Sequence, residues 1–128
     1  MPGLDLQLVA GEFAVCRLPP TEPVPAWAGS AVFSSTTRTR DELSILCPAG
    51  QVPAGIKTER GWRLLQVTGP FDFGAVGVLA SITAPLAAAS ISVLATATFD
   101  TDYVLVKEAR LDDAVRALEA AGHTVRRN

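Results

Sequence analysis

Two acidic residues, Asp100 and Asp102, lie in the stretch TATFDTDYVLVKE between two runs that are typical of β-strands. A carboxylate at such a place can accept hydrogen bonds from an ammonium group and so hold a cationic ligand. Aspartate is also a common turn residue, because its side chain bonds to nearby backbone groups. From the residues alone, both interpretations stay open for Asp100 and Asp102.

A second candidate is the glycine-containing segment TGPFDFGAVG, which precedes an apolar stretch that is predicted to be helical. Free N–H groups at the start of a helix attract a carboxylate, and Gly74 and Gly77 would allow close approach because they lack a Cβ atom. Asp72 is equally suited to cap the helix, and the glycines to bring the helix close to a sheet. The segment lacks the lysine of a phosphate loop and the spacing of a dinucleotide fingerprint.

The other reactive residue types give little support to catalysis or metal binding. The sole histidine, His123, cannot complete a Ser-His-Asp or Cys-His set by itself and is expected at the surface or near a helix end. Cys16 and Cys47 lack metal-ligand spacing, so we expect two free buried thiols, no metal and no cofactor. The net charge of -2 and the absence of a basic stripe argue against nucleic acid as a partner. We therefore predict that the protein is not an enzyme.

The longest uncharged stretch runs from Phe73 to Phe99, which would be long enough for a transmembrane helix. Its residues are mostly small, Pro85 interrupts it, and its end alternates as a strand does. A buried helix followed by a buried strand explains the missing charges, so no membrane association is predicted. The N-terminus lacks the positive region of a secretory signal, which favours a cytoplasmic location.

The second half of the chain predicts an α+β fold with the element order β-α-β-β-α-β, an antiparallel sheet with both helices on one face. The expected elements are a strand at 62–69, a helix at 73–88, strands at 91–99 and 102–108, a helix at 111–122 and a short strand at 123–127. An apolar stripe on the first helix would consist of Val76, Leu79, Ile82 and Leu86.

The first half reads as an incomplete copy of the second. It predicts strands at 12–19, 30–37 and 42–48, room for one helical turn near Trp27, and a further early strand in LDLQLVA. An offset of 61 residues matches Val32 with Val93 and Asp41 with Asp102 without a gap. We therefore expect a degenerate N-terminal unit at 1–60 and a complete C-terminal unit at 61–128.

The segment LLQVTGPFDFGAVGVLASITAPLAAASISVLATATFDTDYVLVKE resembles the ACT-domain pattern of strand, glycine-containing loop, helix, strand, hairpin and strand. Together, TRTRDELSILCP and ATFDTDYVLVKE resemble a group of small bacterial tandem ACT-domain proteins. That group is related to the regulatory ACT domains of aspartate kinases and to the CASTOR-type amino-acid sensors. The resemblance covers nearly the whole chain, from about Phe13 to Val125.

The resemblance implies two ferredoxin-like ACT units and a small amino acid bound at the boundary between them. It implies a regulatory homodimer that reports to an unknown effector protein; the alternative is a ligand-free interaction and dimerisation module. By position, the resemblance assigns the ligand to the loop that includes Asp72, Phe73, Gly74 and Gly77, and the ligand's cationic end to Asp102. The chemistry of a zwitterion site adds Val78, Thr98 and Asp100 to the predicted ligand-binding residues, with Asp100 favoured as a turn residue.

Overall fold

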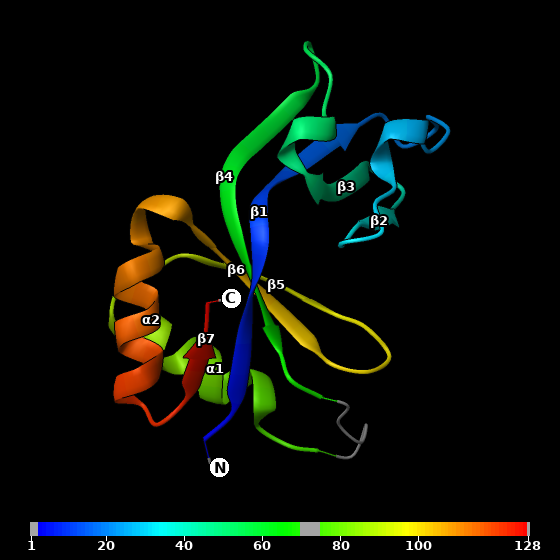
Figure 1. The fold of residues 1–128 in the computed structure, drawn as a ribbon. Coiled ribbons are helices and arrows are strands. Elements are labelled where there is room, and N and C mark those ends of the chain that lie inside the picture. The colour runs from blue at the N-terminus through cyan, green and yellow to red at the C-terminus, as the bar shows by residue number, and fades with distance from the viewer. Residues whose placement is uncertain (1–2, 70–74, 128) are drawn as a thin grey trace. The chain divides into compact units, whose positions relative to one another are not determined.

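A computed structural model describes residues 3–69 and 75–127, which form two compact units. Unit 1 contains the chain up to Ala10 and again from Arg63 onward, and unit 2 contains Gly11–Trp62. The strands are β1 (Asp5–Leu18), β2 (Ser35–Arg38), β3 (Leu43–Pro48), β4 (Lys57–Val67), β5 (Val93–Ala97), β6 (Asp102–Lys107) and β7 (Thr124–Arg126), and the helices are α1 (Val78–Ala88) and α2 (Leu111–Ala120) (Figure 1).

The two long strands, β1 and β4, each contribute residues to both units. Each carries a glycine with positive φ close to the change of unit, Gly11 at +99° and Gly61 at +85°. Side chains disfavour this conformation, and a glycine that adopts it within a strand marks a local break in regular pairing. At Gly61 the backbone N–H is satisfied by the carboxylate of Glu12 at 2.8 Å.

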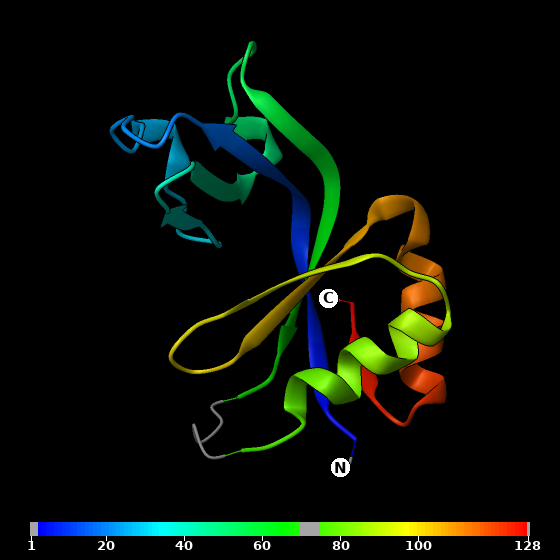
Figure 2. The same ribbon diagram turned by 180° about the vertical axis from the view of Figure 1, so that it is seen from behind.

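Unit 1 has the predicted α+β order, β4-α1-β5-β6-α2-β7, and its strands follow the spatial order β7-β1-β4-β6-β5. The early strand expected from LDLQLVA is present as the first part of β1. It lies between β4 and β7 and pairs in parallel with β7, from Asp5 opposite Thr124 to Gln7 opposite Arg126. Both helices cover one face of these strands, as the views from either side show (Figures 1 and 2).

The apolar stripe of α1 differs from the predicted one. The buried residues are Val78, Ile82 and Leu86, spaced by four, which pack with Leu6 of β1 in the core of the unit. Val76 is 86% exposed because it precedes the helix, which begins only at Val78. Leu79 is 38% exposed and lies off the buried stripe.

Helix α2 buries the face that the sequence predicts, Leu111, Val115 and Leu118. Asp112 lies in its first turn, where a carboxylate suits the helix dipole. A hydrogen bond and the positive charge of Arg127 hold the pKa of Asp112 below its usual value.

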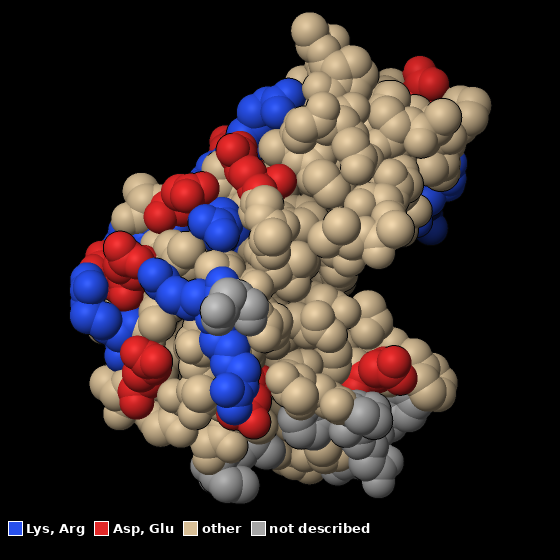
Figure 3. Space-filling view, in the orientation of Figure 1, with Lys and Arg blue, Asp and Glu red and all other residues tan. Residues whose placement is uncertain are grey.

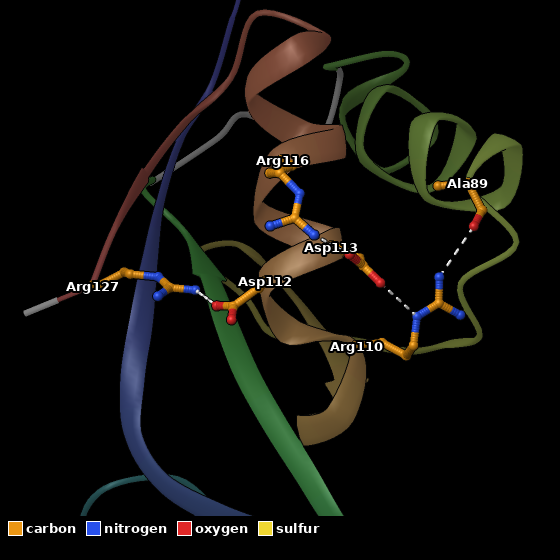
Figure 4. A network of polar contacts seen from close by, with 6 residues as sticks. All are labelled: Ala89, Arg110, Asp112, Asp113, Arg116 and Arg127. Carbon is orange, nitrogen blue, oxygen red and sulfur yellow. Dashed lines mark hydrogen bonds and ion pairs between the residues drawn. The ribbon is translucent and has the colours of Figure 1, made fainter.

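An arginine links the two helices of unit 1 (Figure 4). The Arg110 guanidinium donates to the carbonyls of Ala89 and Ser90, each at 3.3 Å, at the end of α1. Its Nε group lies 3.1 Å from the carboxylate of Asp113, which Arg116 also contacts. Cations near the last carbonyls of a helix stabilise them, so Arg110 contributes the end cap that α1 lacks in its own sequence.

His123 is buried, at 6% exposure, and not at the surface as the sequence suggested. Its Nδ1 accepts from the N–H of Leu4 at 3.0 Å, and its Nε2 lies 2.8 Å from the Ser81 carbonyl. A carbonyl accepts only, so Nε2 carries the proton and the ring is the neutral tautomer. Pro85, four residues after Ser81, has no N–H to donate within the helix. The imidazole therefore supplies the donor that the proline removes.

Unit 2 holds its strands in the order β2-β3-β1-β4. In place of helices it has two single 3-10 turns, Ala26–Ala28 and Ala49–Gln51, as its short proline- and glycine-rich segments predicted. These turns cover one face of the strands. The buried residues of that core are Ala14, Cys16, Ala28, Leu43, Ile45, Cys47, Ala49 and Val52.

We expect His123→Ala to lower the free energy of unfolding by about 2 kcal/mol, because two buried backbone groups lose their partners. Pro85→Ala restores an N–H that can reach the Ser81 carbonyl within the helix. The double variant should therefore be more stable than the sum of the single changes predicts, with a coupling of about 1 kcal/mol. Urea unfolding of the four proteins measures this coupling, and strictly additive effects would contradict the assigned role of His123.

Candidate functional site

The predicted hairpin of unit 1 is present, with β5 and β6 paired antiparallel and Ala97 opposite Asp102 at its closing end. Between these strands the turn at residues 98–101 is closed by Thr98. Its N–H donates to the Thr101 carbonyl at 2.9 Å, and its hydroxyl donates to the same carbonyl at 3.2 Å. Asp100 lies exposed within this turn. The turn is thus held by threonine and backbone groups.

Unit 2 contains a second turn of the same construction, between β2 and β3. There the N–H of Thr39 donates to the Glu42 carbonyl at 2.8 Å, and the Thr39 hydroxyl lies 3.4 Å from it. The hairpin closes with Arg38 opposite Leu43. Matching the two turns gives 98 − 39 = 59 and 101 − 42 = 59. The repeat is real at the level of the hairpin, but its offset is 59 and not the predicted 61.

With the offset of 59, different acidic residues of the two hairpins become equivalent. Asp41 matches Asp100, since 100 − 41 = 59, and both occupy the same place in equivalent turns. Asp102 matches Leu43, which is buried in the core of unit 2. The carboxylate of Asp102 makes no hydrogen bond or ion pair with any residue that the structure describes, and it is partly exposed. Asp102 is therefore an acid that the turn itself does not require.

The turn at 98–101 packs against the end of β4. The hydroxyl of Thr101, a buried residue, donates to the Val67 carbonyl at 2.7 Å. A Cβ atom on Gly69 would lie 2.9 Å from the Asp100 carbonyl oxygen, so only glycine fits there. The loop that follows β4 thus starts beside the acidic turn. Thr101 was not singled out from the sequence; its signal is the repeated threonine-closed turn. Gly69 was expected only as a turn residue after the strand.

The loop after β4 ends at α1, where Gly77 is the N-cap with φ of +83° and no capping side chain. The helix begins at Val78, later than predicted, and the Gly77 carbonyl accepts from the Ser81 N–H at 2.9 Å. The side chain of Val78 is buried in the core, so only its backbone could meet a ligand. Three further predicted residues, Asp72, Phe73 and Gly74, lie outside the described residues.

The two thiols do not form a reactive centre. Cys16 and Cys47 are both free and buried on adjacent strands of unit 2. Burial and the neighbouring Cys16 raise the pKa of Cys47 to about 11. A thiol with that pKa is almost wholly protonated at neutral pH and is a poor nucleophile. Within residues 3–69 and 75–127, no three acidic, cysteine or histidine side chains are grouped as metal ligands.

The charged surface shows no field of a single sign in the view of Figure 3, where acidic and basic side chains alternate. Nucleic-acid-binding surfaces gather lysine and arginine on one face, which this face does not do. Among the described helices, none has the length and apolar character needed to cross a bilayer.

Two known family models match the chain, each over a different range. The model of the ACT domain matches residues 57–120, which include β4, α1, β5, β6 and α2. The chain belongs to the ACT domain family. A second model, described as an N-terminal domain, matches residues 11–55, which lie within unit 2.

Solved structures are similar to the ACT-domain chain over most or all of its length. An X-ray structure from Agrobacterium tumefaciens is 34% identical, with a TM-score of 0.95, and covers 100% of this chain and 96% of its own. A Vibrio cholerae protein of unknown function, described as a possible transport protein, is 22% identical with a TM-score of 0.71, covering 94% and 91%. The regulatory subunit of aspartate kinase from Thermus thermophilus is 10% identical with a TM-score of 0.60, and the similarity covers 92% of this chain and 93% of that subunit. At these low identities, the Vibrio cholerae and Thermus thermophilus structures show a similar fold only.

A shorter similarity joins the chain to the human protein called cytosolic arginine sensor for mTORC1 subunit 1. The two are 37% identical over 59 residues, which is 45% of this chain and 18% of the sensor. The chain thus spans less than a fifth of that relative's length.

The raised pKa of Cys47 predicts a loss of stability at alkaline pH. Its ordinary value of 9.0 applies to the unfolded chain and about 11 to the folded one. The unfolded state therefore releases this proton first as the pH rises. The stabilising effect is complete below pH 9 and is lost between pH 9 and 11.

Melting temperatures of the native protein and of Cys47→Ala, compared across this pH range, measure the effect. The native protein should lose more stability with rising pH than the variant does, because only the native protein carries this thiol. Parallel curves for the two proteins would show that Cys47 is not the group responsible.

Proposed function

We propose that this ACT-domain protein is a non-enzymatic regulator that binds a small amino acid, with Asp102 of unit 1 as the acceptor of the ligand's ammonium group. The observation that carries the proposal is the contrast between the two hairpins. They share their turn construction, but only unit 1 places a carboxylate at the first position of the second strand. That carboxylate has no partner within the described residues, and an ammonium group would supply one.

The start of α1 complements this acid. The first N–H groups of a helix are unpaired within the helix and attract a carboxylate, aided by the helix dipole. Gly77 provides no capping side chain for them, and the first turn of α1 contains no acidic residue. Gly69, after the end of β4, lies next to the turn that precedes Asp102. The ligand's ammonium group would bond to Asp102, and its carboxylate to the first N–H groups of α1.

The relatives support a regulatory role. One structural neighbour is a regulatory subunit of an enzyme of amino-acid metabolism, and one relative in sequence is named as an arginine sensor. We propose by extension a cytoplasmic protein that reports the level of an amino acid to an effector protein. The predicted place of the ligand at the boundary of two ACT units stays a prediction.

A ligand-free dimerisation module is the second candidate, and the edge strand β5 favours it. This strand ends the strand order of unit 1 and contains Val93–Ala97, with no charged residue to discourage pairing. Exposed edge strands without charges commonly pair with another chain. In this case the protein would be a homodimer whose melting temperature depends on its own concentration and on no amino acid.

A thermal-shift screen with each of the twenty standard amino acids tests the proposal. A ligand present at 100 times its dissociation constant stabilises the folded state by about 2.7 kcal/mol. Asp102→Asn should weaken the response about tenfold or more, because a charge-assisted hydrogen bond is lost. Asp41→Asn is the matched control, since Asp41 lies in the equivalent turn of unit 2 and should leave the response unchanged.

Gly69→Ala gives an independent check of the place of the site. The added methyl group would meet the backbone of Asp100 and must shift the turn, so the ligand response should weaken although no charge is altered. A protein that responds to no amino acid would favour the dimerisation module. An equal response of the native protein and of Asp102→Asn would show that the amino acid does not bind at Asp102.

A further inference from the structure

Unit 2 has a hollow that the ACT resemblance does not assign. It has a volume of about 250 Å³, and its lining comes from β1, β4 and the start of β3. Because β1 lies between β3 and β4, Val15 and Arg17 form its floor, and the flanking strands form its walls. Pockets for small molecules usually have volumes of about 300 Å³ or more, so this one would suit a very small ligand.

The hollow lies on the sheet face opposite the core of unit 2. Side chains alternate between faces along a strand, and Cys16 and Ile45 point into the core. Arg17 and Ser44 are directly opposite each other in the β1–β3 pairing, one position along, and so share the other face. Three of the lining residues, Arg17, Lys57 and Glu59, are exposed. The hollow is therefore open to small solutes.

Charges of both signs surround this space. Arg17 is fixed in place, because its Nη2 donates to the Asp41 carbonyl at 2.9 Å. Glu42 comes from the β3 side, and Lys57 and Glu59 come from the β4 side. Glu59 already has an interaction within the protein. Neither the carboxylate of Glu42 nor the ammonium of Lys57 makes a hydrogen bond or ion pair with a residue that the structure describes. The carboxylate of Glu42 could thus bind a cationic group, and the ammonium of Lys57 could bind an anionic group, in the same hollow.

We propose that this hollow is a second binding site, for a small zwitterion that carries both an ammonium and a carboxylate group. The ligand's ammonium group would bond to Glu42, and its carboxylate to Lys57 and to the remaining donors of Arg17. A simple anion would leave Glu42 unpaired and repelled, and a simple cation would do the same to Lys57. A zwitterion satisfies both walls at once. The proposal is independent of the site at Asp102.

Amide chemical shifts of the ¹⁵N-labelled full chain test this site. Glycine and L-valine, titrated into the millimolar range at constant ionic strength, should give saturable shifts at Arg17, Ser44 and Thr58. Sodium acetate and methylammonium chloride each carry one half of the zwitterion, and each should bind at least tenfold more weakly at these residues, a difference of about 1.4 kcal/mol.

Two charge-removing variants should reproduce that loss. Glu42→Gln and Lys57→Met should each weaken zwitterion binding about tenfold, because each removes one charged partner. Glu22→Gln and Arg40→Met are the controls, since both residues are exposed in unit 2 and neither lines the hollow. Unchanged amide spectra away from the altered residue would show that the variants keep their fold.

The two proposed sites can fail separately in this experiment. Shifts at residues 98–102 report on the site in unit 1, and shifts at Arg17, Ser44 and Thr58 report on the hollow. Shifts confined to unit 1, or equal binding of acetate and glycine at the hollow, would overturn the zwitterion site. Saturation at the hollow without a response at 98–102 would support it and count against the function proposed for Asp102.

Discussion

The neutral imidazole of His123 is the contact on which the geometry of unit 1 depends most. It donates to the Ser81 carbonyl and accepts from the Leu4 N–H, so one ring joins α1 to the segment that leads into β1. Both parts matter to the candidate site. The N–H of Ser81 bonds to Gly77, the N-cap of α1, and β1 lies beside β4, which leads to Gly69. The ring thus joins the helix whose start is proposed to bind the ligand's carboxylate to the segment that leads into β1, beside β4.

Local patterns predicted the element order of unit 1 and its β5–β6 hairpin, but not the pairing of β1 with β7. Apolar residues recur every two positions in a strand and every three to four in a helix, and short segments are enough to show this. The β-α-β-β-α-β order therefore follows from the sequence. The pairing of β1 with β7 joins residues 119 positions apart, from Asp5 and Thr124 onward. The burial of His123 has the same origin, because its partner Leu4 lies at the other end of the chain. Contacts at such separation leave no local signal.

The internal repeat shows why counting identities gave the wrong register. The offset of 61 rests on a few identities, such as Val32 with Val93 and Asp41 with Asp102, but the offset of 59 also matches Asp41 with an aspartate, Asp100. Hydrogen bonds give 59, because a threonine that closes a four-residue turn must stand at a fixed distance from the carbonyl it binds. Thr39 and Thr98 meet that requirement in both hairpins, whereas side chains on the exposed strand faces vary freely. The geometry of the backbone is therefore the safer guide to the repeat than the chance recurrence of an acid.

With the register corrected, the two halves of the chain differ at one informative position. Leu43 begins β3 and is 1% exposed, so the equivalent position in unit 1 could have held an apolar residue that adds to stability. Asp102 stands there instead, partly withdrawn from water and without a partner among the described residues. A carboxylate at that place adds no apolar contact to the core and forms no ion pair among the described residues. The proposed ligand would supply that ion pair through its ammonium group. The same reasoning separates Asp102 from Asp100. Asp100 is equivalent to Asp41, and the presence of an acid in both turns indicates that it belongs to the turn.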